Sequence, residues 1–88
     1  MNEADIRREL RAYIEDNFLY MHPGVELADS DDFLSRAIVD SLGFVELVEE
    51  VQGRYALSVD DVEITEDNFG SIDAIVGYVL RKQTAAAA

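Results

Sequence analysis

The sequence contains no cysteine, and it has only one histidine and one proline. Without cysteine the chain can form neither a disulfide framework nor a cysteine-based zinc site, and any thiol chemistry would have to come from a bound group. Cysteine-free chains are typical of reducing compartments. The single histidine, His22, precedes Pro23 and has no cysteine to form a hydrolytic dyad with. We therefore expect a solvated loop histidine, and we find no glycine-rich phosphate loop.

Basic residues are also scarce, because 7 Lys and Arg residues stand against 19 Asp and Glu residues, for a net charge of −12. This charge repels phosphate backbones and anionic lipid surfaces, so we expect neither nucleic-acid nor membrane binding. The longest apolar run near the end, residues 74–80, is far shorter than the ~20 residues of a spanning helix. The first residues are acidic and lack an apolar segment, so we expect no secretory signal and a cytoplasmic location.

What remains is an ordinary globular composition in 88 residues, 49% of them hydrophobic, which predicts one small domain with a modest core. Apolar residues recur at helical spacing over residues 3–19, with Asn2 as the expected N-cap. The predicted core stripe of this helix is Ile6, Leu10, Tyr13, Ile14 and Phe18.

Residues 20–39 show no periodicity and predict a long loop, of the length that usually marks a functional segment or a missed element. Its acidic run, residues 29–32, does not fit a calcium-binding EF-hand: Phe33 and Leu34 fall where a ligand and a glycine are required, and Asp40 falls in place of the final glutamate. We therefore expect a solvated acidic loop and no metal site. Phe33, Leu34 and Ile38 are the expected contacts of this loop with the core.

The second helix is predicted over residues 41–55, and its apolar residues fall into two sets. Leu42 and Val45 lie opposite the core-facing set, among Glu46, Glu49 and Gln52. A core position cannot explain these two residues. The core-facing set is Phe44, Leu47, Val48, Val51 and Tyr55.

After a loop anchored by Val59 and Val62, Thr65 is expected to cap a short third helix that Gly70 ends. Ser71 then caps a last helix, which we expect to close at residues 81–82. The predicted fold is all-α: a small four-helix bundle of three longer helices and one short helix, with a long loop between the first two. We expect a domain over residues 1–83 and a disordered tail over residues 84–88.

Ser41 is the most informative residue, because its hydroxyl is expected to project from the first turn of a helix that Asp40 caps. A phosphodiester attached there would meet free backbone N–H groups and the positive end of the helix dipole. The alternative is that Asp40 and Ser41 only cap the helix.

The charge distribution adds context to this position. Residues 40–63 hold seven acidic residues and one arginine, a net charge of −6 and half of the total. Such a run is often only a solvated surface. Here the acids flank the exposed Leu42 and Val45, and an apolar centre with an ionic rim is how many docking surfaces are built. A basic protein partner would bind there, on the surface formed by Leu42, Val45, Glu46 and Glu49, which we call the recognition face.

The segment Ile38-Val39-Asp40-Ser41-Leu42-Gly43-Phe44-Val45-Glu46-Leu47-Val48 closely resembles the attachment motif of acyl and peptidyl carrier proteins. The resemblance extends over residues 3–82. It implies a monomeric, non-catalytic carrier in which a phosphopantetheinyl transferase attaches 4′-phosphopantetheine from coenzyme A to Ser41. It also implies that Asp40 assists the transferase and its Mg²⁺, and that Leu42, Val45 and Glu46 recognise partners.

In that family the thiol of the arm carries acyl or aminoacyl intermediates as thioesters between loading and synthase enzymes. Ala37 stands where many members have glycine, and Gly43 stands where fatty-acid carriers usually have aspartate. These departures favour a carrier of a specialised pathway, polyketide-like or aminoacyl-loading, over the fatty-acid carrier. The alternative hypothesis is an unmodified acidic helical module that binds a basic protein.

Overall fold

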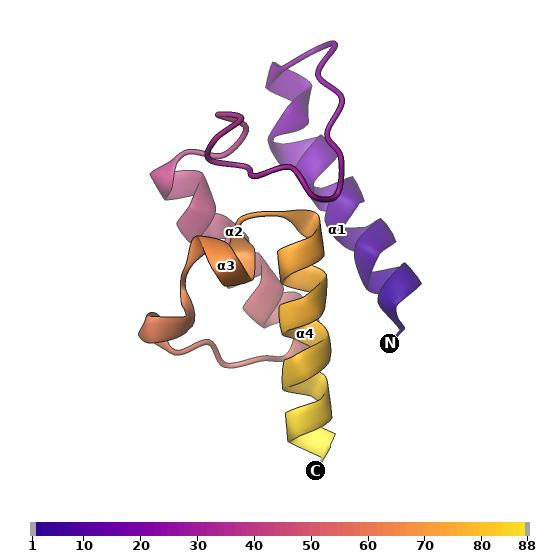
Figure 1. The fold of residues 1–88 in the computed structure, drawn as a ribbon, viewed down its shortest axis with the longest axis vertical. Helices are drawn as coiled ribbons and strands as arrows, with labels where there is room; N and C mark the ends of the chain where they lie inside the picture. The colour runs from indigo at the N-terminus through magenta and orange to yellow at the C-terminus, as the bar shows by residue number, and fades with distance from the viewer. Residues whose placement is uncertain (1, 88) are drawn as a thin grey trace.

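The chain folds into helices joined by loops, as a computed structural model that describes residues 2–87 shows (Figure 1). No strand occurs in that range, which confirms the all-α prediction of three longer helices and one short helix. Two 3₁₀ turns, η1 and η2, were not predicted. The elements in chain order are α1 (Glu3–Asn17), η1 (Leu19–Met21), α2 (Ser41–Tyr55), η2 (Asp61–Glu63), α3 (Glu66–Phe69) and α4 (Ile72–Ala87).

The long helices start where the sequence predicts, because polar side chains there accept hydrogen bonds from the free N–H groups of the first turn. Asn2 Oδ1 accepts from the amide of Asp5 at 2.9 Å, and Ser71 Oγ accepts from the amide of Ala74 at 3.0 Å. Thr65 occupies the N-cap of α3, but its side chain makes no capping hydrogen bond. Helix α1 ends at Asn17, two residues before the predicted end, because the chain turns into η1.

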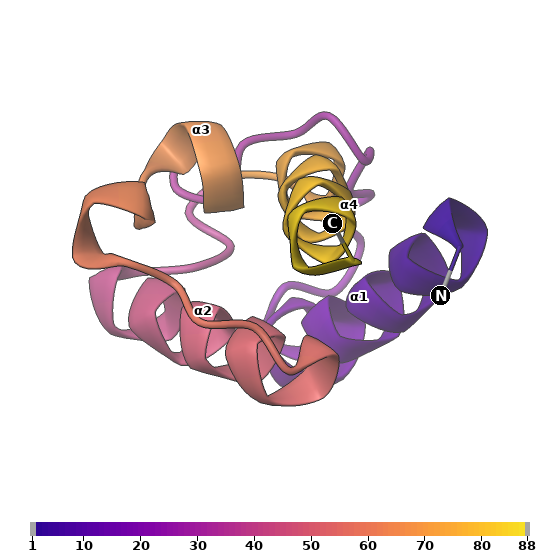
Figure 2. The ribbon, with the colours of Figure 1, turned by 90° about the horizontal axis from the view of Figure 1, so that it is seen from below.

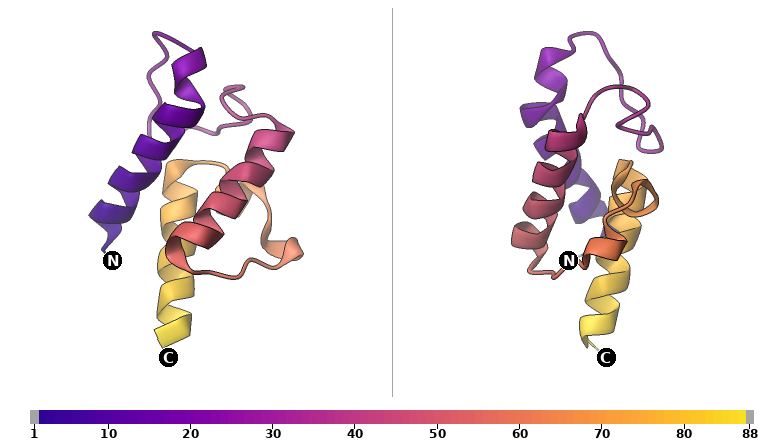
Figure 3. Two further views of the ribbon diagram at one scale, coloured as in Figure 1. Left: turned by 180° about the vertical axis from the view of Figure 1, so that it is seen from behind. Right: turned by 90° about the vertical axis from the view of Figure 1, so that its left-hand side faces the viewer.

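The hydrophobic core lies between α4 and the other helices, with α4 packed against both α1 and α3 (Figure 2). Seen from behind, α2 crosses in front of α4 (Figure 3). In α2, Phe44 is only half-buried, whereas the other four predicted core residues are buried. The side chains with essentially no exposure include Ile6, Leu10, Ile14, Phe33, Leu47, Val51, Phe69, Ile72, Ile75 and Val79.

The long segment between α1 and α2 is tied to the start of α4 by backbone hydrogen bonds. The amide of Phe33 donates to the carbonyl of Gly70 at 2.7 Å, and the amide of Asp73 donates to the carbonyl of Asp29 at 2.9 Å. Phe33 and Ile38 are buried, as predicted. Leu27 and Val39 are also buried, two anchors that the missing periodicity concealed, whereas Leu34, the third predicted contact, is only half-buried.

The acidic run was expected to be solvated, and this expectation is wrong for Asp29. Its carboxylate pairs with Arg7, at 2.8 Å, and with Arg11, both on α1. Arg7 also pairs with Asp73 on α4, so one ionic network joins α1, the long loop and α4. The guanidinium of Arg11, followed by that of Arg7, holds the pKa of Asp29 below its usual value. These partners are far apart in the sequence, which is why spacing alone could not reveal them.

This network predicts a pH-dependent contribution to stability. Because the folded-state pKa of Asp29 is below its unfolded value of about 3.9, the contribution is present above that pH and is lost as the pH falls through the folded pKa. We expect Asp29→Asn to lower the free energy of unfolding at pH 7 by about 1 kcal/mol. Urea unfolding at pH 7 and pH 3 measures this, with Asp16→Asn on the exposed side of α1 as the control. An equal loss at both pH values would contradict the ionic explanation.

Two further expectations are corrected near the other end of the chain. Val62 lies in η2 and is 85% exposed, so it is not an anchor, whereas Val59 is half-buried as predicted. Helix α4 continues to Ala87, so the described part of the expected disordered tail, residues 84–87, is helical. Alanine has the highest helix propensity, which favours this extension. Ala88, the last residue of the expected tail, and Met1 lie outside the described residues.

Ala37 adopts a left-handed backbone conformation, with φ of 55°. Holding a residue with a Cβ atom in this conformation costs about 1–2 kcal/mol in steric strain. A glycine avoids this strain but loses roughly 0.5–1 kcal/mol more than alanine in conformational entropy on folding. We therefore expect Ala37→Gly to stabilise the protein by about 0.5–1 kcal/mol in urea unfolding. Ala28→Gly in the same loop is the control: Ala28 is not one of the residues with a positive φ, so this substitution should destabilise the protein. If Ala37→Gly and Ala28→Gly both lowered the free energy of unfolding, the explanation that Ala37 is strained would be contradicted.

Candidate functional site: the start of α2

Ser41 is the first residue of α2, and it is exposed, as predicted. Asp40 caps the helix: its Oδ1 accepts from the amide of Gly43 at 2.7 Å, and its carbonyl accepts from the amide of Phe44 at 2.8 Å. The amides of Ser41 and Leu42 have no acceptor within the described part of the chain. An anion bound next to Ser41 would find these two donors and the positive end of the helix dipole.

Gly43 lets the end of α1 approach the first turn of α2. A Cβ atom at this position would lie 2.9 Å from Cε1 of Phe18 and 3.2 Å from Oδ1 of Asp40. Contacts this short require a neighbour to move. Gly43 therefore has a packing role, since it allows the Phe18 ring to lie against α2.

The recognition face has the exposure that the sequence predicted. Leu42 is 69% exposed and Val45 is 50% exposed. Glu46 and Glu49 are also exposed. The surface of α2 next to Ser41 therefore combines apolar side chains with carboxylates, as a docking surface for a basic partner would.

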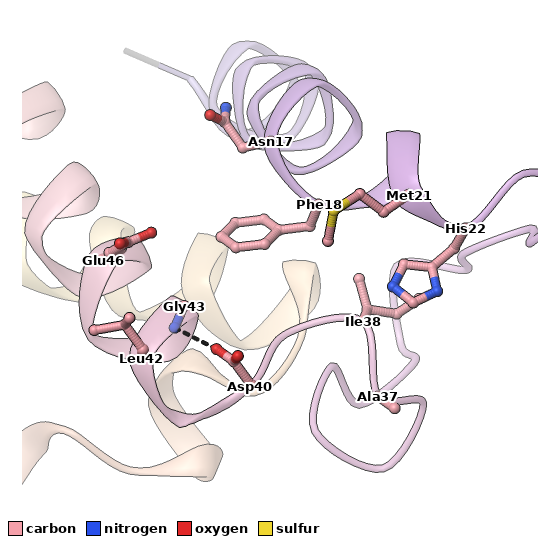
Figure 4. A pocket seen from close by; sticks show the side chains of 10 residues that line it. All are labelled: Asn17, Phe18, Met21, His22, Ala37, Ile38, Asp40, Leu42, Gly43 and Glu46. Carbon is pink, nitrogen blue, oxygen red and sulfur yellow. Dashed lines mark hydrogen bonds between the residues drawn. The ribbon is translucent and has the colours of Figure 1, made fainter.

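An open pocket of about 280 Å³ lies between the end of α1, η1 and the start of α2 (Figure 4). Sequence patterns could not reveal it, because its walls come from three segments, and one of them was expected to be an irregular loop. The unpredicted turn η1 brings Met21 and His22 to the pocket. The lining residues are Asn17, Phe18, Met21, His22, Ala37, Ile38, Asp40, Leu42, Gly43 and Glu46.

His22 was expected to be solvated, but it is half-buried and lines this pocket. Within residues 2–87, no three His, Cys, Asp or Glu side chains gather where they could hold a metal ion.

Ionisable groups with shifted pKa values lie where elements pack together and not at Ser41. Burial, together with the nearby carboxylate of Glu9, raises the pKa of Tyr55 to about 12. The Tyr55 hydroxyl donates to Glu9 at 3.3 Å and links α2 to α1. A hydrogen bond from the amide of Asp60, followed by those from Lys82 and Tyr78, lowers the pKa of Glu63. The bonds from Lys82 and Tyr78 also tie η2 to α4. These groups are structural, and none of them surrounds the Ser41 hydroxyl.

The fold and the site define a small acidic helical domain that exposes one serine hydroxyl at the start of its second long helix. The sequence profile of the family described as "phosphopantetheine attachment site" matches residues 8–79. The match covers most of the chain, and the protein belongs to this family. Domains of this family carry a covalently attached 4′-phosphopantetheine and are generally non-catalytic carriers, which implies interacting enzymes. No helix among the described residues is long and apolar enough to span a membrane.

Proposed function

We propose that Ser41 is the residue to which 4′-phosphopantetheine is attached and that Asp40 is its flanking acid. The observation that carries this proposal is the exposed position of Ser41 at the capped start of α2. The amides of Ser41 and Leu42 would donate to the phosphate, because they are not used within the described chain. The residues present therefore fit the group. The bound arm would supply the thiol that this cysteine-free chain lacks.

The protein would present acyl or aminoacyl thioesters to enzymes of fatty acid, polyketide or related specialised biosynthesis. The recognition face supports this role, since its exposed apolar residues and carboxylates suit enzymes with basic docking surfaces. Tethering raises the effective concentration of the cargo at each partner, which free diffusion could not do. Ala37 and Gly43 continue to favour a specialised pathway, polyketide-like or aminoacyl-loading, over the fatty-acid carrier.

The test of Ser41 is modification of the purified chain by a phosphopantetheinyl transferase with coenzyme A, followed by intact-mass measurement. We expect the wild-type chain to gain the mass of one phosphopantetheine, and Ser41→Ala to gain none. Ser35→Ala is the matched control, because Ser35 is also exposed, on the loop that precedes α2. It should be modified like the wild type.

A mass gain that persists in Ser41→Ala would contradict the assignment of the site. No gain in any variant would favour the alternative function, an unmodified acidic module that binds a basic protein. That alternative also predicts that Ser41→Ala retains full activity in cells.

A further inference from the structure

The pocket between η1 and α2 adjoins the proposed attachment residue. Asp40 and Leu42, which flank Ser41 in the chain, both line it. A group tethered to Ser41 therefore starts at the rim of the pocket, and its entry is an intramolecular event that needs little affinity.

The pocket combines apolar walls with groups that can form hydrogen bonds. Phe18 and Met21 extend from the end of α1 and from η1 toward α2, and Ile38, on the loop that precedes α2, also lines the pocket (Figure 4). Asn17 and His22 can each hydrogen-bond with an amide. A pantetheine chain has two amides and a geminal dimethyl group, and it matches such a mixed lining.

The volume also limits what the pocket can hold. At about 280 Å³ it lies just below the range of about 300–1,000 Å³ for small-molecule pockets. It is large enough for part of the arm but not for the arm together with a long acyl chain.

The opposite side of α2 is filled by aromatic rings. The Phe44 ring meets the Phe69 ring edge-to-face, with centroids 6.5 Å apart, and the Phe69 and Tyr78 centroids are 4.8 Å apart. Phe69 and Tyr78 are almost completely buried. A group entering between α2 and α3 would have to displace these rings, at the cost of their packing.

We propose that the 4′-phosphopantetheine arm of this protein docks in the pocket formed by α1, η1 and α2, and not between α2 and α3. This inference rests on the proposed attachment at Ser41. In the docked state the arm contacts Phe18, Met21 and Ile38, and its amides face Asn17 and His22.

Nuclear magnetic resonance tests this, because His22 is the only histidine and Met21 is one of only two methionines. Intact mass first establishes that the arm is attached. The ring signals of His22 and the methyl signal of Met21 are then compared between the unmodified and the modified protein. We expect both to shift on modification, and we expect nuclear Overhauser contacts between the geminal methyl groups of the arm and the Phe18 ring.

Two variants on η1 separate docking from a general effect of modification. Met21→Glu places a charge in the pocket, whereas Tyr20→Glu places the same charge on a neighbouring exposed residue that does not line it. Both should accept the arm. The shift of His22 on modification should be lost in Met21→Glu and retained in Tyr20→Glu.

Contacts of the arm with Phe44 or Phe69 instead of Phe18 would overturn the proposal. So would an arm whose signals match those of free pantetheine, or a His22 shift that is equal in both variants. Failure of the attachment itself would be recognised earlier, as the absence of a mass gain, and would contradict the function and not the docking.

Discussion

Replacing Glu46 by lysine is expected to lower kcat/KM for loading by a phosphopantetheinyl transferase about tenfold at low ionic strength. Glu46 is exposed one helical turn beyond Leu42, on the recognition face. Charged residues at the rim of an interface act mainly on the association rate, and salt screens this effect. The variant should therefore also show a weaker dependence of the loading rate on salt than the wild type.

Asp61→Lys is the matched control for this substitution. Asp61 is an exposed residue of η2, beyond the other end of α2, and its replacement changes the net charge by the same amount. Loading rates that fall equally in both variants would show that only the total charge of −12 matters. Unchanged rates in Glu46→Lys would contradict the assignment of the recognition face.

Replacing Phe69 by alanine is expected to lower the free energy of unfolding by about 3–5 kcal/mol. Phe69 is the only buried residue of α3, and its ring packs between Phe44 and Tyr78. A helix of four residues has almost no stability of its own, so its position depends on this side chain. For a small domain the loss is a large part of the total stability.

Urea unfolding followed by circular dichroism measures this loss. Val62→Ala removes an apolar side chain that is exposed, and it should change the stability by less than about 0.5 kcal/mol. A Phe69→Ala protein with nearly wild-type stability would contradict the view that the aromatic rings between α2 and α4 form a tightly packed part of the core.

Much of the fold could be predicted because the helices carry local signals. Asn2, Asp40 and Ser71 cap helices through hydrogen bonds within three residues, and apolar spacing located the buried faces of α1 and α2. The end of α4 was placed too early, since residues 84–88 were expected to be a disordered tail although alanine favours helix.

The long loop was harder to predict because its contacts are with distant parts of the chain. Asp29 forms ion pairs with Arg7 and Arg11, which lie about twenty residues earlier in the sequence. The amide of Phe33 donates to the carbonyl of Gly70, from which it is separated in the sequence by the whole of α2. Neither contact follows from a repeating pattern. The exposure of Ser41 and of the side chains on the proposed recognition face was predicted. The pocket was not, because it forms only when α1, η1 and α2 come together.

The central claim is that Ser41 carries the prosthetic arm. The most direct test is to purify the protein from its own host, measure its intact mass and locate the added group by fragmentation. We predict an added mass of one phosphopantetheine, with or without a thioester-bound cargo, confined to the fragment that contains Ser41. An unmodified chain, or the group found on another residue, would contradict the account.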